Sequence, residues 1–312
     1  MILSVSRRTD IPSYYSEWFF NRLKEGDVCV RNPMNIHRVS RIALNKDVID
    51  GIVFWTKNPK PMMKHLDKLN DYAFYFQFSL NPYSTDIEKN IPSKKDSIIP
   101  TFIDLSNSIG KERVVWRYDP ILINKNYSLE YHTKYFTLLC EKLSPYTEKC
   151  TISFIDLYRN IAKNLMQRGI TSIPNEVQEE IALTFSQIAK NYGLIIDTCC
   201  EGIDLSKYGI GHAACIDVKR LERIGGYKLN LSKDKNQREE CGCFESIDIG
   251  AYNTCKNGCK YCYANFSNKL VERNFSMHNP NSPLLYGNLE PDDVVSDKNV
   301  MSNRINQISL FE

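Results

Sequence analysis

The stretch that decides the fold is Val114-Val115-Trp116-Arg117-Tyr118-Asp119, a short apolar run that ends in charged residues. Successive side chains of a strand point to opposite faces. A run that is apolar at consecutive positions is therefore typical of a parallel strand covered on both sides. Similar runs occur at 2–6, 52–56, 73–79, 151–155 and 194–198, and segments with helical spacing of apolar residues lie between them, at roughly 15–25, 59–70, 95–109, 129–143 and 175–192. Repeated strand–helix units predict an α/β fold.

Polar side chains gather where these predicted strands end. They are Ser6, Arg7, Arg8, Thr9 and Asp10; Thr56, Lys57 and Asn58; Gln77 and Ser79; Arg117 and Asp119; Ser153 and Asp156; and Cys199, Cys200 and Glu201. In β/α barrels the active site lies at the carboxyl ends of the strands. We therefore expect a partial TIM-like β/α barrel with one polar-floored cavity. The alternative is that these are ordinary loop residues and helix N-caps.

The pattern of alternating strands and helices weakens after about residue 200. We expect a β/α barrel over 1–200 and a cysteine-rich segment over 201–273 that packs on it. The second segment includes a short helix near 218–225 and a last strand at 247–252 that leads into a cysteine loop. The tail, 274–312, is rich in Asn, Ser, Pro and Asp and is predicted to be extended.

Composition narrows the class of protein without naming a partner. The chain has 312 residues, with 40 Lys and Arg against 37 Asp and Glu, so its net charge of +3 neither requires nor excludes nucleic acid. No apolar run approaches the roughly 18 residues of a membrane span, and the first ten residues do not resemble a signal peptide. We expect a cytoplasmic protein with no membrane partner. Its 11 cysteines should be metal ligands, catalytic thiols or core residues, not disulfides.

One cysteine loop carries the strongest chemical signal. Cys255-Lys256-Asn257-Gly258-Cys259-Lys260-Tyr261-Cys262 has the spacing Cys-x3-Cys-x2-Cys. Three thiolates on one tight loop can ligate three irons of a [4Fe–4S] cluster and leave the fourth iron open, and Gly258 permits a sharp turn between ligands. The alternative is zinc, but a structural zinc site needs four Cys or His ligands and the nearest histidine is His278.

This loop resembles the signature of the radical S-adenosylmethionine (radical SAM) superfamily, including the aromatic residue before the last cysteine. Tyr263-Ala264 is similar to the spore photoproduct lyase branch, as are the segments at 56–57, 78–80, 88–92 and 118–121, in that order. The chain also resembles an uncharacterised bacterial family that opens Ser-Arg-Arg-Thr-Asp-Ile-Pro and carries a late cysteine motif. The resemblance implies a [4Fe–4S] cluster, S-adenosylmethionine (SAM) on its open iron, Tyr261 packed on the adenine, and a reductant such as flavodoxin or ferredoxin. Ser79 and Gln77 are further candidates for contacts to the cofactor.

The position of the motif departs from the usual pattern. Radical SAM proteins normally carry the three cysteines after the first strand of the barrel, whereas here they follow the last predicted strand. Circular permutation accounts for the difference, because chain termini often lie close together. It predicts that 247–252 lies beside 2–6.

Further cysteines stand apart from the loop. Cys199, Cys215, Cys241 and Cys243 can together supply four thiolates to a second [4Fe–4S] cluster; zinc or free thiols are the alternatives, and Cys200 can replace Cys199. The resemblance to the uncharacterised family favours Cys199. Cys29, Cys140 and Cys150 lie in apolar surroundings and are predicted to be core residues.

The charged residues at the strand ends are candidates for the reaction. Arg7, Arg8, Lys57 and Arg117 can bind the SAM carboxylate or an anionic substrate, since Arg in particular recognises such groups in a bidentate way, and Asp10 and Asp119 can accept hydrogen bonds from ribose hydroxyls. The alternative for each is a buried salt-bridge network across the mouth of the barrel.

Three classes of function remain open from the sequence. The protein is a radical enzyme acting on nucleic acid, for lesion repair or modification; a radical enzyme acting on a small molecule or peptide; or a non-catalytic iron–sulfur or zinc protein. Gln307-Ile308-Ser309-Leu310-Phe311 favours the first class, because it resembles the short peptide by which bacterial repair proteins dock on the sliding clamp. In that interpretation Leu310 and Phe311 enter an apolar pocket and Gln307 bonds at its rim. The alternative is that this apolar end packs on the protein's own core.

Overall fold

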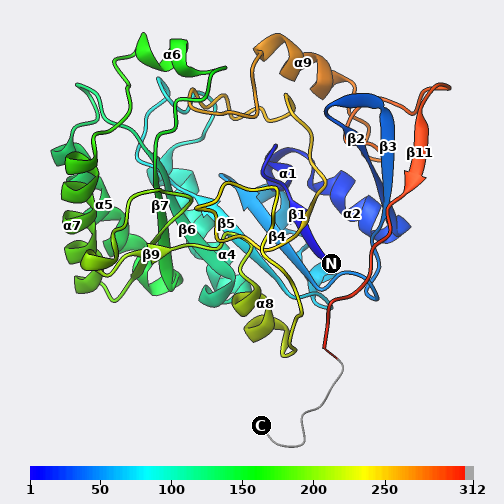
Figure 1. Cartoon of the computed structure of the whole chain (residues 1–312), viewed down its shortest axis with the longest axis horizontal. Coiled ribbons are helices and arrows are strands. Elements are labelled where there is room, and N and C mark those ends of the chain that lie inside the picture. The colour runs from blue at the N-terminus through cyan, green and yellow to red at the C-terminus, as the bar shows by residue number, and fades with distance from the viewer. Residues whose placement is uncertain (306–312) are drawn as a thin grey trace, which may run out of the picture.

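The computed structural model describes residues 1–305 and contains a large parallel sheet with helices against it (Figure 1). The predicted clamp-binding residues Gln307, Leu310 and Phe311 lie outside the described residues. Eight strands, all parallel, follow one another across the sheet in the order β10 (Ile247–Asp248), β1 (Ile2–Val5), β4 (Gly51–Thr56), β5 (Phe74–Ser79), β6 (Val114–Ile121), β7 (Lys149–Phe154), β8 (Ile195–Thr198) and β9 (Gly211–His212). The prediction of an α/β fold with a parallel sheet is confirmed.

The strands are buried on both faces, as their consecutive apolar residues predict. On one face Phe54 contacts Phe19 of a helix at a ring separation of 5.4 Å, and Trp116 stacks on Phe136 of another helix. On the other face alternate residues of the same strands, such as Val53 and Val115, pack against the segment that follows residue 199. The isolated cysteines Cys29, Cys140 and Cys150 are buried, as predicted.

The helices are α1 (Ile11–Tyr14), α2 (Ser16–Glu25), α3 (Lys60–Met63), α4 (Ile99–Ile109), α5 (Leu129–Leu143), α6 (Ala162–Met166), α7 (Asn175–Asn191), α8 (Val218–Gly225) and α9 (Asn268–Ser276). Each expected helical segment except 59–70 contains a matching helix, and α1, α6 and α9 were not predicted. The single helix expected at 59–70 is wrong, because the chain forms two short turns, α3 and Leu66–Leu69. Met62, Leu66 and Leu69 are all buried, so the spacing identified the buried face but not the break. Within 1–305 no helix is long and apolar enough to span a bilayer.

A second, smaller sheet was not predicted. It consists of β2 (Asp27–Asn32) and β3 (Asn35–Ala43), which are antiparallel, and β11 (Val294–Asp297), which runs parallel to β3. These strands lie together at one side of the molecule (Figure 1). The tail expected to be extended therefore contains a strand. Most of β3 is exposed, so it lacks the apolar run that revealed the central strands.

The last strand of the large sheet lies beside the first. Leu3 of β1 pairs with Ile247 of β10, and Ser4 pairs with Asp248, in parallel. This adjacency was predicted, although β10 has only two residues of the six expected. The pairs found within 1–305 leave β10 and β9 as the two edges of the sheet, so the parallel sheet is established while closure into a barrel is not.

Candidate functional site

The carboxyl ends of the strands surround one cavity of about 1210 Å³. It is lined by residues at or just beyond the carboxyl ends of β1, β4, β5, β6, β7 and β8, among them Arg7, Lys57, Ser79, Asp119 and Ser153. Both sets of cysteines also line it: Cys255, Cys259 and Cys262 from the loop after β10, and Cys199, Cys215, Cys241 and Cys243. The structure thus brings the predicted strand ends and the predicted metal ligands to a single site.

The cysteine loop is held by hydrogen bonds from two earlier segments. The hydroxyl of Tyr15 donates to the Thr254 carbonyl at 2.6 Å, and the hydroxyl of Tyr14 donates to Asn257 Oδ1 at 2.8 Å. The N–H of Asn90 donates to the Asn257 carbonyl at 3.1 Å. These hydrogen bonds fix the loop between the end of α1 and the segment after β5.

The turn between the first two cysteines needs glycine. Gly258 has a φ of +69°, and a Cβ atom there would lie 3.1 Å from the side-chain nitrogen of Asn90. Left-handed backbone and close approach both favour glycine, as expected for a turn between ligands. Cys259, the next residue, pairs with Glu88 across an antiparallel bridge.

The three loop thiols are buried, so their thiolate forms need a positive charge beside them. Burial raises the pKa of Cys255, Cys259 and Cys262, that of Cys259 to about 12, while Lys57 acts in the opposite direction on Cys259 and Cys262. Metal coordination deprotonates such thiols outright. The donor set fits a cluster with one iron left free of protein ligands.

Within the described residues no three cysteine sulfurs lie within 4.8 Å of one another, although Cys199 Sγ and Cys215 Sγ are 3.1 Å apart. Zn–S bonds of about 2.3 Å place tetrahedral sulfur ligands less than about 4 Å apart. Among residues 1–305 the only group of three or more His, Cys, Asp or Glu ligand atoms within 4.8 Å of one another is His37, Asp292 and Asp293, two of which are exposed.

A buried carboxylate organises the positive charge beside Cys259. Glu88 is 1% exposed and accepts a hydrogen bond from Lys57 Nζ at 2.8 Å; Lys94 and the hydroxyl of Tyr261 also donate to it. Burial alone would raise the pKa of Glu88, but the charges of Lys57 and Lys94 outweigh it and lower the pKa to about 2. Burial alone would lower the pKa of Lys57, but Glu88 raises it to about 12.

Tyr261 and Lys57 are thereby fixed against the loop. Lys57 Nζ lies 5.5 Å from the centre of the Tyr261 ring, and Asn81 Nδ2 donates to the Tyr261 hydroxyl at 3.3 Å. Glu88 was missed as a site residue by the sequence analysis. Its only signal was its place in one of the segments resembling the photoproduct lyase branch.

The two aspartates serve internal networks. Asp10 is 5% exposed and accepts from the Lys57 N–H at 2.8 Å and from Asn257 Nδ2 at 3.0 Å, so it joins the ends of β1 and β4 to the cysteine loop. Burial raises the pKa of Asp10. Asp119 pairs with Arg117, whose Nε donates at 2.8 Å, and also accepts from Ser153. Of the two interpretations, these contacts support the buried network over free ribose acceptors.

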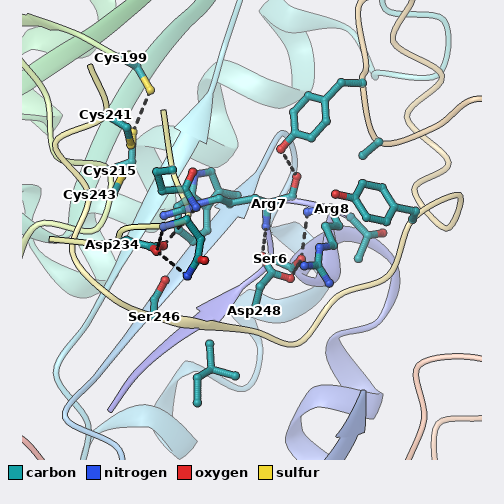
Figure 2. Close-up of a pocket in the computed structure, with 18 of the residues that line it drawn as sticks. Ser6, Arg7, Arg8, Cys199, Cys215, Asp234, Cys241, Cys243, Ser246 and Asp248 are labelled. Atoms are coloured by element: carbon teal, nitrogen blue, oxygen red, sulfur yellow. Dashed lines mark hydrogen bonds between the residues drawn. The ribbon is translucent and has the colours of Figure 1, made fainter. Parts of the chain in front are cut away.

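The other cysteines form a second group, the auxiliary set Cys199, Cys215, Cys241 and Cys243 (Figure 2). The sulfurs of Cys199 and Cys215 are 3.1 Å apart. Hydrogen bonding with Cys199 and Cys243 lowers the pKa of Cys215 well below its ordinary value, and hydrogen bonding with Cys243 lowers the pKa of Cys241 to about 6. The same hydrogen bonds raise the pKa values of Cys199 and Cys243, so two thiolates of the set are each stabilised by neighbouring thiols.

Three residues predicted to contact SAM or substrate lie at the auxiliary set. Arg117 Nη1 donates to Cys215 Sγ at 2.8 Å, and Gln77 Nε2 donates to the Cys215 carbonyl at 2.9 Å. Arg7 stacks on Trp55, with 5.3 Å from its guanidinium carbon to the ring centre. Burial alone would lower the pKa of Arg7. The negative charges of Cys243, Cys215 and Asp248 outweigh burial, so the pKa of Arg7 is raised.

The remaining predicted residues face the cavity itself. Arg8 stands over the Tyr252 ring at 5.2 Å, on the side away from the auxiliary set, and Ser79 lines the wall. Cys200 also lines the cavity but hydrogen bonds only with Cys241 of the auxiliary set, which favours Cys199 as the fourth ligand. All 11 cysteines are free.

The model of one protein family matches residues 2–264, which is most of the chain. The chain belongs to the DUF1848 family. That family is described as a domain of unknown function, and its matched range includes both cysteine sets of this DUF1848 chain. No curated protein matches the chain.

Among solved structures, a protein of Bacteroides thetaiotaomicron VPI-5482 that is provisionally named an alpha-L-fucosidase is similar to this DUF1848 chain. The identity is 13% over 72% of this chain and 83% of that chain, with a TM-score of 0.27. A likeness at this level carries no argument about fold or activity.

Proposed function

We propose that this DUF1848 protein is a radical SAM enzyme whose [4Fe–4S] cluster is held by Cys255, Cys259 and Cys262. The observation that carries the proposal is that one loop delivers three thiols to a cavity at the carboxyl ends of a parallel sheet. Three protein ligands leave one iron open for SAM. When bound, the cluster and SAM would supply a 5′-deoxyadenosyl radical that abstracts hydrogen from the substrate.

The chain's own residues position and enclose this chemistry. Glu88, Lys57 and Tyr261 form a rigid wall beside Cys259, and Asp10 locks the loop to the ends of β1 and β4. Such locking favours a fixed geometry for the reacting groups. Tyr261 offers its ring to the adenine, and Arg8, which lies over the Tyr252 ring at the cavity and has no ion-pair partner among the described residues, offers its charge to an anionic substrate.

The arrangement of strands supports a permuted radical SAM barrel. The strand that leads into the cysteine loop pairs with β1, so the loop occupies the place that follows the first strand in an unpermuted chain. Permutation changes the connectivity but not this neighbourhood. The cysteine motif at 255–262 can therefore lie at the same site as the residues that follow β1.

The auxiliary set is proposed to hold a second [4Fe–4S] cluster. Four thiols line the same side of the cavity, and the sulfurs of Cys199 and Cys215 are 3.1 Å apart. The ratio of metal to sulfide decides between the metals. About eight irons per chain correspond to two clusters, and about four irons with zinc correspond to one cluster and a zinc site.

We further propose a cytoplasmic enzyme that draws electrons from a flavodoxin or ferredoxin and acts on nucleic acid, in lesion repair or modification. The cavity of about 1210 Å³ exceeds the roughly 300–1,000 Å³ of ordinary small-ligand pockets, and the proposed clusters, SAM and the reacting part of a substrate would share it. The clamp-like sequence at 307–311 supports this substrate class. A small molecule or peptide is the alternative, and nucleic-acid binding with a steep salt dependence separates the two.

The test is anaerobic reconstitution with iron and sulfide, addition of SAM and dithionite, and measurement of 5′-deoxyadenosine. The matched control is Cys140→Ala, which removes a buried cysteine of α5 away from the cavity and should leave cleavage intact. A colourless, zinc-containing protein, or an iron-containing one that makes no 5′-deoxyadenosine, would refute the proposal.

A further inference from the structure

Two arginines approach the auxiliary set from the parallel sheet. Arg117, on β6, is 5% exposed and places its guanidinium between two anionic partners, with Nη1 on Cys215 Sγ and Nε on Asp119. Part of its charge is therefore matched by Asp119, and the rest faces the sulfur. A charge-assisted bond of this kind is strong because donor and acceptor are both held away from water.

Arg7, which follows β1, is held by contacts of its own. Its backbone N–H donates to Asp248 at 2.8 Å, its guanidinium stacks on Trp55, and Figure 2 shows its side chain on the side of the four cysteines. Its Nη2 is buried and has no hydrogen-bond partner among the described residues. A buried donor without an acceptor is costly, so an orphan of this kind in a native site calls for an explanation.

The chemistry of the auxiliary set supplies that explanation. Four thiolates carry four negative charges, and either a zinc ion or an oxidised [4Fe–4S] core offsets only two of them. A metal centre here is thus an anion buried in protein, which is unfavourable unless cations lie beside it. The orphan Nη2 is a donor for a thiolate or for an inorganic sulfide of the cluster.

We propose that Arg7 and Arg117 are the counter-charges of an anionic, all-cysteine metal centre at the auxiliary set, and that they determine how firmly it is held and how readily it is reduced. The inference rests on the proposed auxiliary centre and is independent of the radical reaction. Hydrogen bonds to the sulfurs and nearby positive charge favour the more negative, reduced state of a cluster. Arg7 and Arg117 are thus positioning residues for the metal centre, not contacts to SAM.

The experiment uses the full chain with Cys255, Cys259 and Cys262 replaced by Ser, so that only the auxiliary set holds metal. The first readout is the rate at which metal is lost anaerobically to a chelator, which applies to iron and zinc alike. Arg7→Met should lose metal at least tenfold faster, and Arg7→Lys, which keeps the charge, should remain close to the parent. Arg8→Met is the matched control and should not change the rate, because Arg8 lies over Tyr252.

The second readout applies where the metal is iron. A reductive titration followed by electron paramagnetic resonance should show a lower midpoint potential in Arg7→Met. At the parent's midpoint the ratio of reduced to oxidised cluster should fall at least tenfold, a displacement of about 59 mV. Arg117→Met combined with Asp119→Asn should act in the same direction, because Asp119→Asn leaves no carboxylate unpaired.

Each outcome decides the proposal. Unchanged retention and potential in a folded, metal-loaded Arg7→Met protein would overturn it, as would an equal effect of Arg8→Met or a parent that binds no metal at all. If Arg7→Met does not fold, Arg7→Lys decides, since loss of metal despite a retained charge contradicts the electrostatic account. Absence of 5′-deoxyadenosine in the wild-type protein would refute the radical function and leave these measurements unaffected.

Discussion

Replacing Glu88 by Gln should remove the negative charge that pairs with Lys57 and Lys94. The change keeps the volume of the side chain but leaves Lys57 and Lys94 without their shared carboxylate. The folded-state pKa of Glu88 is about 2, against an ordinary value of 4.5. The difference corresponds to about 3 kcal/mol of stability at neutral pH. Losing one partner of a buried ion pair typically costs a similar amount, roughly 3–5 kcal/mol.

The measurement is urea unfolding of the metal-free protein under reducing conditions, followed by circular dichroism. In that form Cys259, with a pKa of about 12, is a neutral thiol and adds no charge. Glu88→Gln should lower the free energy of unfolding by about 3 kcal/mol. Glu272→Gln, on the exposed face of α9, is the control and should stay within about 0.5 kcal/mol of wild type.

The pH dependence gives a second check with a definite sign. Because folding lowers the pKa of Glu88, its contribution is fully present above pH 4.5 and is lost as the pH falls toward 2. The difference between wild type and Glu88→Gln should therefore be constant from pH 8 to about 5.5 and shrink below about 4.5. The double variant with Lys57→Met should show a coupling of at least about 1 kcal/mol between the two residues. A loss under about 1 kcal/mol for Glu88→Gln, or a difference that grows on acidification, would refute this account of the network.

Three further predictions concern the metals and the end of the chain. Replacing Cys255, Cys259 and Cys262 by Ala should abolish 5′-deoxyadenosine formation, since the iron that binds SAM is lost; retained product would contradict the ligand assignment. Replacing the four auxiliary cysteines by Ser should lower iron from about eight to about four per chain and leave the loop cluster in place, as checked by iron and sulfide analysis. A peptide covering 300–312 should bind purified sliding clamp in a titration, and Leu310→Ala with Phe311→Ala should remove binding; no binding by the parent peptide up to about 1 mM, roughly −4 kcal/mol, would exclude recruitment by this route.

The sequence was most informative where one property repeats along the chain. Consecutive apolar residues located the strands β1, β4, β5, β6, β7 and β8 within about three residues, because a parallel strand buried on both faces must be apolar at nearly every position. The helical spacing at 129–143 and 218–225 gave the bounds of α5 and α8. The same logic failed for β3, whose exposed positions leave no apolar run, and for 59–70, where two short turns bury the same face as one helix.

For the site, the sequence by itself determined which candidate ligands and polar side chains are available, since the cysteine spacing of 255–262 and the polar strand ends are local features. It could not assign Gln77, Arg7 and Arg117 to the right neighbours. Alternation places Tyr75 and Gln77 on one face of β5, and Val115 and Arg117 on the same face of β6, but only the tertiary structure shows that Cys215 covers that face. A side chain's role depends on what packs against it. Here the covering segment, which contains Cys215, is distant in sequence from β5 and β6. No local sequence pattern predicts where it packs.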